Sequence, residues 1–235
     1  MLVWLDIDNI CQFKVRNMPH LTIDIVSDVV CPWCIIGYRG LEAAIEALGK
    51  NIDVSVHWCP FELAPATPPQ GQTLADYTRE RYGATPEQSS QSRTRIVDAG
   101  RALGIDFRYG PDSRIYNSHK AHELLTWAGK TSDKQTALKL ALFAAYFTDQ
   151  ANISDDAVLL DTVERVGLNR AEASVILTDR RYVAVVDSEV AHWQDQNITG
   201  VPAFIVNSTY MIPGAQDTAT FGRVLDRVLE KVGGA

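Results

Sequence analysis

The chain has 235 residues and a mass of 26.0 kDa, with 46% apolar and 22% charged side chains and a formal net charge of −7. A chain of this size and composition can bury a sizeable core in one or two domains. The acidic excess argues against a nucleic-acid binder that works through a broad basic face. No apolar run approaches the roughly 18 residues that a membrane helix requires. We therefore expect neither nucleic acid nor membrane as a partner.

The first residues and the cysteine content indicate a cytoplasmic protein. The segment MLVWLDIDNICQFK carries Asp6 and Asp8 where a secretory signal has basic residues and an unbroken apolar core. Four cysteines are too few for a disulfide scaffold. In a reducing compartment, the closely spaced Cys31 and Cys34 are suited to turnover rather than to a structural bond.

The chain opens with a β-α-β pattern. Alternating apolar residues predict strands over residues 21–28 and 52–58. The helix between them is expected to begin at Pro32, which suits the first helical position, and to stop at Gly49. A short crossover helix implies that the two strands are parallel.

The middle of the chain is predicted to be helical. Four prolines between residues 60 and 69 mark a loop, and Thr73 is a suitable N-cap after it. The expected helices are 87–103, 117–129, 133–148, 155–166 with Ser154 as its cap, and 170–178.

Strand patterns return near the end of the sequence. Residues 203–207 and 209–213 flank a turn at Asn207-Ser208 and predict a hairpin, and Asp217 can cap a last helix. The fold class is therefore α/β with a large all-helical insertion. We expect one domain from residues 19–63 plus 185–235, an insertion over 64–184, and an N-terminal extension over 1–18.

Cys31 and Cys34 lie where the first strand passes into the first helix. At the N-cap, free N–H groups and the helix dipole favour a thiolate, so the pKa of Cys31 is expected to fall. Cys34 lies one turn further on the apolar stripe and should be less exposed. Two residues at this spacing can meet the distance requirement of a disulfide. An exposed Cys31 can attack a substrate disulfide, and a sheltered Cys34 can resolve the mixed disulfide.

Gly200-Val201-Pro202 stands directly before a predicted strand, where proline is tolerated only at the first residue or at an edge. A cis bond between Val201 and Pro202 would turn the Val201 backbone toward the cysteine pair as a docking edge for substrate. An ordinary loop proline is the alternative.

With these segments in view, the chain resembles the thioredoxin-fold DsbA family and, within it, the FrnE-like oxidoreductases. The likeness spans about residues 21–231 and is carried by DIVSDVVCPWCIIG (24–37), CPFELAP (59–65), LGIDF (103–107), AHELLTWA (121–128), ALFAAYFTDQANISD (141–155) and GVPAFIVNSTYMIPGAQD (200–217). It implies a thioredoxin-like fold (β-α-β … β-β-α) with a helical insertion, a redox disulfide Cys31–Cys34 with Cys31 as nucleophile and Cys34 as resolving thiol, and a cis bond before Pro202. The chain departs from the family at Cys59, where relatives more often carry His or Arg, and it lacks the second cysteine pair that some relatives have.

The leading hypothesis is a cytosolic protein disulfide oxidoreductase that acts on disulfide- or thiol-bearing proteins or on glutathione. The expected substrate-binding residues are Pro32, Trp33, Val201, Pro202, Phe61, Gln216 and Asp217. No organic cofactor and no metal is expected, and glutathione is a candidate co-substrate.

Two alternatives remain open. One is a glutathione-dependent isomerase or transferase like the hydroxychromene-carboxylate isomerases and kappa-class transferases. Those proteins carry Ser where Cys31 stands, and Asp217 resembles the Asp with which they hold glutathione. The other is a non-enzymatic, chaperone-like peptide-binding module. The sequence leaves the oligomeric state open, and a homodimer is one possibility.

Other chemistry-bearing residues have simpler interpretations. Cys59 is expected to be a half-buried neutral thiol rather than a third redox centre, and Cys11 to have no role. His119 and His122 beside Glu123 could bind a metal, but surface and packing roles are favoured. Gly129-Lys130-Thr131 lacks the earlier glycine of a phosphate loop.

Overall fold

The computed structural model describes residues 20–49 and 52–233, so the predicted extension over 1–18, with Cys11, lies outside them. Strand β1 (His20–Ser27) is followed by helix α1 (Pro32–Leu48) and strand β2 (Asp53–Pro60). β1 and β2 are parallel, and the last residues of the two strands are paired with each other. The predicted β-α-β opening is confirmed.

The last two strands complete a four-stranded sheet, and a helix follows them. β5 (Ala203–Val206) and β6 (Tyr210–Pro213) form an antiparallel hairpin, and the sheet order is β2-β1-β5-β6. Asn207 and Ser208 in the turn have φ angles of 50° and 51°, which are typical of a tight hairpin. Helix α9 (Thr218–Gly233) begins where Oδ1 of Asp217 accepts the N–H of Thr220 at 2.7 Å, so the predicted cap is confirmed.

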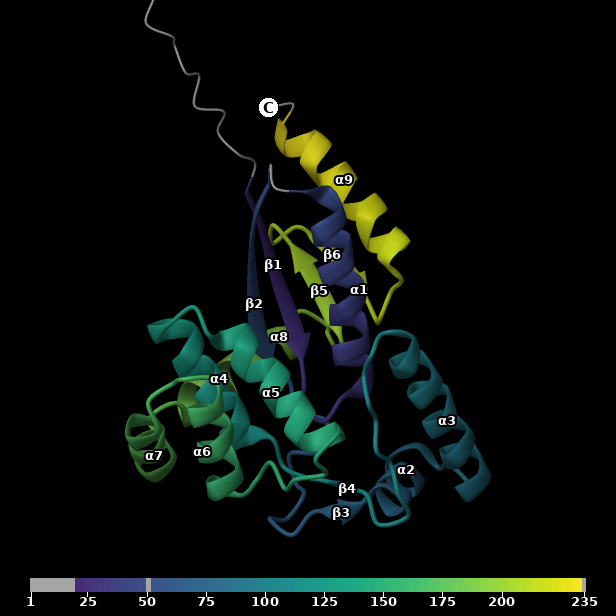
Figure 1. The fold of residues 1–235 in the computed structure, drawn as a ribbon, viewed down its shortest axis with the longest axis vertical. Helices are drawn as coiled ribbons and strands as arrows, with labels where there is room; N and C mark the ends of the chain where they lie inside the picture. Colours follow the sequence, from purple (N-terminus) through teal and green to yellow (C-terminus); the bar gives the residue numbers. More distant parts are fainter. Residues whose placement is uncertain (1–19, 50–51, 234–235) are drawn as a thin grey trace, which may run out of the picture.

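Helices cover both faces of this sheet. α1 and α9 pack side by side over one face (Figure 1). Helix α8 (Val183–Asp195) lies behind the sheet, where its Trp193 packs against Val26, Ala203 and Ile205. Gly40 allows α1 to approach the β6–α9 loop closely, because a Cβ at this position would lie only 2.7 Å from a backbone oxygen of that loop.

The segment between β2 and α8 is mostly helical. Its elements are β3 (Gln72–Thr73), α2 (Leu74–Tyr82), α3 (Pro86–Ala102), β4 (Arg114–Ile115), α4 (His119–Thr131), α5 (Gln135–Phe147), α6 (Asp156–Arg165) and α7 (Arg170–Asp179). The expected cap of α6 is wrong: Oδ1 of Asp155 accepts the N–H of Ala157 at 2.8 Å, while the Ser154 hydroxyl donates to the carbonyl of Pro69. The small β3–β4 sheet was not predicted, because strands of two residues show no alternation.

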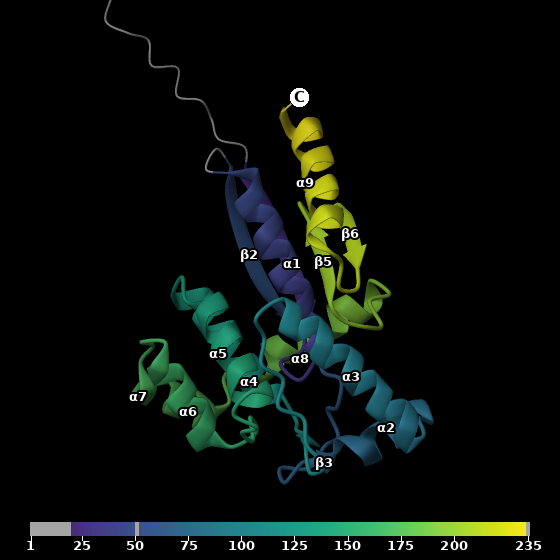
Figure 2. The same ribbon diagram turned by 45° about the vertical axis from the view of Figure 1, so that its right-hand side comes forward.

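These inserted elements gather at the carboxyl end of β1. Helices α4 to α7 lie on one side of that end, and α2 and α3 lie on the other (Figures 1 and 2). Phe143 and Phe147 of α5 and Ile96 of α3 belong to the same core cluster as Cys34 of α1. The junction of β1 with α1 is therefore enclosed between the sheet and the inserted helices. None of the helices within the described ranges combines the length and apolarity needed to cross a bilayer. The domain boundaries stay a prediction.

Candidate active site

The junction between β1 and α1 positions the cysteine pair. Cys31 is the N-cap of α1, and Pro32 occupies the first turn. The N–H of Cys31 donates to the carbonyl of Asp28 at 3.2 Å, and the N–H of Cys34 donates to the carbonyl of Cys31 at 3.2 Å. Both cysteines are free thiols. The turn thus places two sulfurs within one helical turn of each other, at the end of a buried strand.

The expectation of an exposed Cys31 is wrong. Cys31 is 3% exposed and Cys34 0%. Cys31 lies against a cavity of about 400 Å³ whose walls come largely from α2, α3 and the loop before β4. The apolar and aromatic part of the wall is formed by Val30, Pro32, Trp33, Leu63, Leu74, Tyr77, Tyr82, Ala84, Ile96, Tyr109, Ile115, Tyr146 and Val201. Cys34 does not line this cavity, so access still distinguishes the two sulfurs.

The loop before β5 contacts Cys31. The Val201–Pro202 peptide bond is cis. Sγ of Cys31 donates to the carbonyl oxygen of Val201 at 3.6 Å. The carbonyl of Pro202 accepts the N–H of Gly214 at 2.8 Å and ties the loop to the end of β6. Val201 also lines the cavity, so any molecule that reaches Cys31 meets this backbone.

The acidity of the two thiols is opposite to the expectation. Burial, the neighbouring Cys34 thiol and nearby negative charge raise the pKa of Cys31 well above its ordinary value. Its sulfur caps no N–H of α1, so the expected stabilisation of a thiolate by the helix start is not realised in this geometry. Burial also raises the pKa of Cys34, but the neighbouring Cys31 and Ser27 side chains and the charge of Lys139 outweigh it, and the net pKa is lowered. The two thiols therefore do not ionise independently, because each changes the pKa of the other.

Two buried charged residues beneath the pair were not predicted as site residues. Asp28 is fully buried, and its Oδ2 accepts the N–H of Leu63 at 2.6 Å, while Oδ1 lies 3.4 Å from Nε2 of His122. Burial alone would raise the pKa of Asp28, but these contacts lower it. Lys139 of α5 is also fully buried. An acidic strand end directly before Cys31 and a single lysine within the apolar run of α5 are the signals that could have identified them.

The other predicted site residues are spread over three places. Trp33 is 39% exposed at the rim of the Cys31 cavity. Phe61 is buried against the α8 face of the sheet and borders a larger groove of about 1020 Å³, which also reaches Val201. Gln216 donates to the carbonyl of Pro213 at 2.8 Å, and Asp217 caps α9. Neither Gln216 nor Asp217 lines the Cys31 cavity.

The His119–His122–Glu123 cluster is buried rather than on the surface. His122 is 2% exposed and Glu123 0%, and the Glu123 carboxylate pairs with Arg180 at 2.6 Å. Nδ1 of His119 lies 3.2 Å from Oε1 of Glu62, and this carboxylate raises the pKa of His119. Within residues 20–49 and 52–233, no group of three or more His, Cys, Asp or Glu side chains is arranged to hold a metal ion. The packing interpretation accounts for these histidines.

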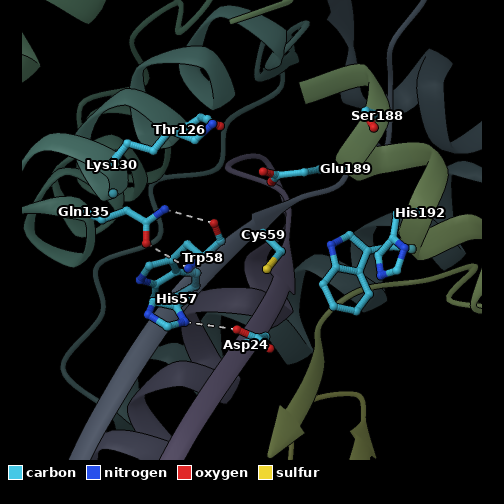
Figure 3. Close-up of a pocket in the computed structure, with 12 residues that line it drawn as sticks. Asp24, His57, Trp58, Cys59, Thr126, Lys130, Gln135, Ser188, Glu189 and His192 are labelled. Atoms are coloured by element: carbon cyan, nitrogen blue, oxygen red, sulfur yellow. Dashed lines mark hydrogen bonds and ion pairs between the residues drawn. The ribbon is translucent and has the colours of Figure 1, made fainter. Parts of the chain in front are cut away.

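Cys59 lies in a separate cavity of about 510 Å³ at the carboxyl end of β2 (Figure 3). Its neighbours there include Asp24, whose carboxylate accepts a hydrogen bond from Nδ1 of His57 at 3.1 Å, and Glu189 of α8. Burial and the negative charges of Asp24 and Glu189 raise the pKa of Cys59. No other cysteine of the described residues lines this cavity. Cys59 is therefore a half-buried thiol that stays protonated near neutral pH.

Comparison with known proteins identifies the class of protein that this fold and site define. Residues 22–226 match the model of the DSBA-like thioredoxin domain, so the chain belongs to the DsbA-like thioredoxin family. The thioredoxin-like fold and the resemblance to the DsbA family inferred from the sequence are confirmed.

Three individual relatives are similar over most of their length. The uncharacterized protein YwbO of Bacillus subtilis (strain 168) is 31% identical over 204 residues, which cover 86% of this chain and 94% of YwbO. The crystal structure of a probable DsbA oxidoreductase from Streptomyces coelicolor has a TM-score of 0.81 at 26% identity, covering 88% of this chain and 89% of that one. The cytosolic disulfide reductase DsbM from Pseudomonas aeruginosa, in a structure with GSH, shares the fold with a TM-score of 0.60 at 16% identity, covering 89% of this chain and 99% of that one.

Proposed function

We propose that the protein is a thiol–disulfide oxidoreductase in which Cys31 is the nucleophile and Cys34 the resolving thiol. The observation that carries this proposal is the different access of two adjacent sulfurs. Cys31 lines a cavity large enough for a substrate segment. Cys34 does not line this cavity and is fully buried. Such a pair suits a reaction in which one sulfur meets the substrate and the other completes the exchange.

The reaction proceeds in two exchanges. Cys31 loses its proton and attacks one sulfur of the substrate disulfide, so that a mixed disulfide forms and the other substrate sulfur leaves with the electron pair and takes up a proton. Cys34 then loses its proton and attacks Sγ of Cys31, which forms the Cys31–Cys34 disulfide and releases the second substrate sulfur with the electron pair and a proton. The substrate gains two electrons, and an external thiol such as glutathione restores the dithiol. The same steps in reverse oxidise a substrate dithiol.

Val201 is the proposed docking point for the substrate chain. Its backbone lies just before the start of β5 and beside Cys31. An extended peptide can form strand-like hydrogen bonds there. The Cys31 cavity and the larger groove both reach Val201, so a polypeptide that crosses it has room on both sides of its cysteine. The aromatic wall around Trp33 suits an apolar side chain next to that cysteine. We therefore propose disulfide-bearing polypeptides as substrates, glutathione as an electron partner, and the cytosol as the place of action.

The glutathione-dependent isomerase alternative has less support. It requires Asp217 to hold the γ-glutamyl end of glutathione near residue 31, but Asp217 caps α9 outside the Cys31 cavity. A non-enzymatic, chaperone-like peptide-binding role would not explain why the thiols of Cys31 and Cys34 lie next to each other.

Reduction of insulin disulfides, driven by glutathione, tests the proposal. The variant Cys31→Ser is expected to lose activity by about 1,000-fold, because it removes the attacking sulfur. The matched control, Cys59→Ser, removes a thiol of the same chain and is expected to keep activity within about twofold. Circular dichroism and thermal unfolding check that both variants fold. Full activity in Cys31→Ser would refute the proposal.

A further inference from the structure

Arg93 of α3 brings a positive charge to the Cys31 cavity. Among the described residues that line this cavity it is the only lysine, arginine, aspartate or glutamate, and the wall around it is largely aromatic and apolar. Its side chain is half-buried, and within residues 20–49 and 52–233 its guanidinium forms no ion pair and hydrogen-bonds only to Ser89. A cation in such surroundings is costly unless an opposite charge lies close by. The cavity therefore favours a ligand that brings a negative charge.

A chain of hydroxyl groups fixes the position of this guanidinium. Nη1 of Arg93 donates to Oγ of Ser89 at 2.8 Å, and Oγ of Ser89 lies 3.0 Å from Oγ1 of Thr78. Because the Thr78 hydroxyl donates to the carbonyl of Leu74 at 2.9 Å, the proton between the two hydroxyls comes from Ser89. The bond to Ser89 uses one N–H of the guanidinium. The other N–H groups can bind a carboxylate through two parallel hydrogen bonds, a geometry that suits arginine.

The carboxylates of the neighbouring elements have other partners. Asp76 and Glu80 of α2 bind Arg79 and Gln72, Asp98 of α3 binds Arg101, and Asp28 beneath the cysteines accepts the N–H of Leu63. Neither these four carboxylates nor the exposed Glu87 in the first turn of α3 lines the Cys31 cavity. A carboxylate that meets Arg93 in this cavity therefore comes from a bound molecule.

We propose that Arg93 binds a carboxylate of the thiol or disulfide molecule that reacts at Cys31, and so selects anionic peptidic thiols over uncharged ones. The proposal rests on the proposed function in taking Cys31 as the reacting sulfur. Arg93 and Cys31 line one cavity of about 400 Å³, a volume typical of small-ligand sites. The ligand must therefore carry its sulfur and its carboxylate close together. Glutathione, a tripeptide with a carboxylate at each end, meets this requirement, and so does a polypeptide cysteine followed by an acidic residue.

The apolar wall makes this contact selective. Little water reaches a charge beside aromatic side chains, so the attraction between guanidinium and carboxylate is stronger there than at an exposed position. The protein as a whole is acidic, with a formal net charge of −7, which disfavours anions elsewhere on its surface. Arg93 is thus a specificity-determining residue that contacts the ligand at a distance from the reacting sulfur.

Binding of a thioether measures this contact without exchange chemistry. S-methylglutathione, whose sulfur cannot form a disulfide, is titrated into the dithiol protein by calorimetry. Two capped tripeptides, in which S-methylcysteine is followed by glutamate or by glutamine, represent a polypeptide with and without the acidic group. Arg93→Gln is expected to weaken binding of a carboxylate-bearing probe at least about tenfold and to leave the glutamine peptide unchanged. The control Arg95→Gln removes the same charge from an exposed position of α3 outside the cavity, and should change each affinity by less than about twofold.

The probes also distinguish the two sources of the carboxylate. A loss of affinity for S-methylglutathione identifies glutathione, and a loss confined to the glutamate peptide identifies an acidic polypeptide; either result supports the proposal. Unchanged affinities in a folded Arg93→Gln protein, an equal loss for the glutamine peptide, or no binding of any probe at millimolar concentration would overturn it.

Thermal unfolding shows whether Arg93→Gln folds. If it does not, the unmodified protein decides: a carboxylate-bearing probe must bind more tightly than the glutamine peptide, by a margin that shrinks as salt is added, and equal affinities overturn the proposal. The binding measurement requires no reaction at Cys31. Failure of the insulin assay would therefore refute the proposed function and leave the binding result standing.

Discussion

Two cavities of similar size, about 400 and 510 Å³, each contain a cysteine near the carboxyl end of a neighbouring strand. The cavity at Cys59 holds several ionisable side chains, whereas the cavity at Cys31 is mostly aromatic and apolar. A polar, partly open cavity would be the more obvious candidate for chemistry. Nevertheless, only the Cys31 cavity has a second sulfur within one helical turn and a peptide edge beside it.

The sign of the nearby charge explains the contrast between the two sites. Cys34 has the buried ammonium of Lys139 near it, and this charge favours the thiolate. Cys59 faces the carboxylates of Asp24 and Glu189, which favour the protonated thiol. Burial acts in the same direction at both positions, so it does not separate them. The proposed redox role of the Cys31–Cys34 pair thus rests on a partner sulfur and on the net charge around it rather than on exposure.

The largest expected difference between the sites is in the capture of substrate. Cys34→Ser removes the resolving thiol while Cys31 can still attack, so mixed disulfides at Cys31 should accumulate to a large fraction of the protein. Cys59→Ser, with both active thiols intact, should accumulate none. Non-reducing electrophoresis with peptide mapping of the linked cysteine measures this. Mixed disulfides that map to Cys59 would contradict the assignment of substrate capture to Cys31.

A smaller difference is expected in alkylation of the native dithiol protein. Cys31 should react faster than Cys59 at pH 8. The ionisation of Cys31 is shared with a second thiol, whereas the carboxylates of Asp24 and Glu189 oppose ionisation of Cys59. Mass mapping after brief exposure to iodoacetamide gives both rates.

The variant Glu189→Gln sharpens this comparison. It removes one of the two carboxylates that oppose ionisation of Cys59, so labelling of Cys59 should increase several-fold while that of Cys31 stays unchanged. Equal rates at Cys31 and Cys59 in the parent protein would contradict the assigned environments.

Much of the fold could be predicted because its elements carry clear local signals. The alternation in β1 and β2, Pro32 at the start of α1 and Asp217 before α9 each specify structure through neighbouring residues. The β3–β4 pair could not be predicted in this way, since its pairing joins residues about 40 positions apart, for example Gln72 with Ile115. Asp155 rather than Ser154 caps α6, because the Ser154 hydroxyl donates to the carbonyl of Pro69 in a loop far away in the sequence.

Only the parts of the candidate site that carry a recognisable sequence motif could be predicted. The CPWC segment and the Val201–Pro202 loop were identified from the sequence, and the structure brings them to within 3.6 Å at Cys31 and Val201. The burial of Cys31 was missed because its cover comes from α2 and α3, far along the chain. Lys139 was missed for a related reason: an apolar helix face predicts core, and the sequence does not show which buried sulfur lies opposite that lysine.

The most direct test of the central claim is the disulfide state of each cysteine in glutathione buffers of increasing oxidised fraction. The wild-type protein is equilibrated, quenched in acid, alkylated and mapped by mass spectrometry. We expect a disulfide between Cys31 and Cys34 to form over a narrow range of the buffer ratio, while Cys59 remains a free thiol throughout. Cys31 and Cys34 that stay reduced at every ratio, or a first disulfide that involves Cys59, would contradict the assignment of the redox centre.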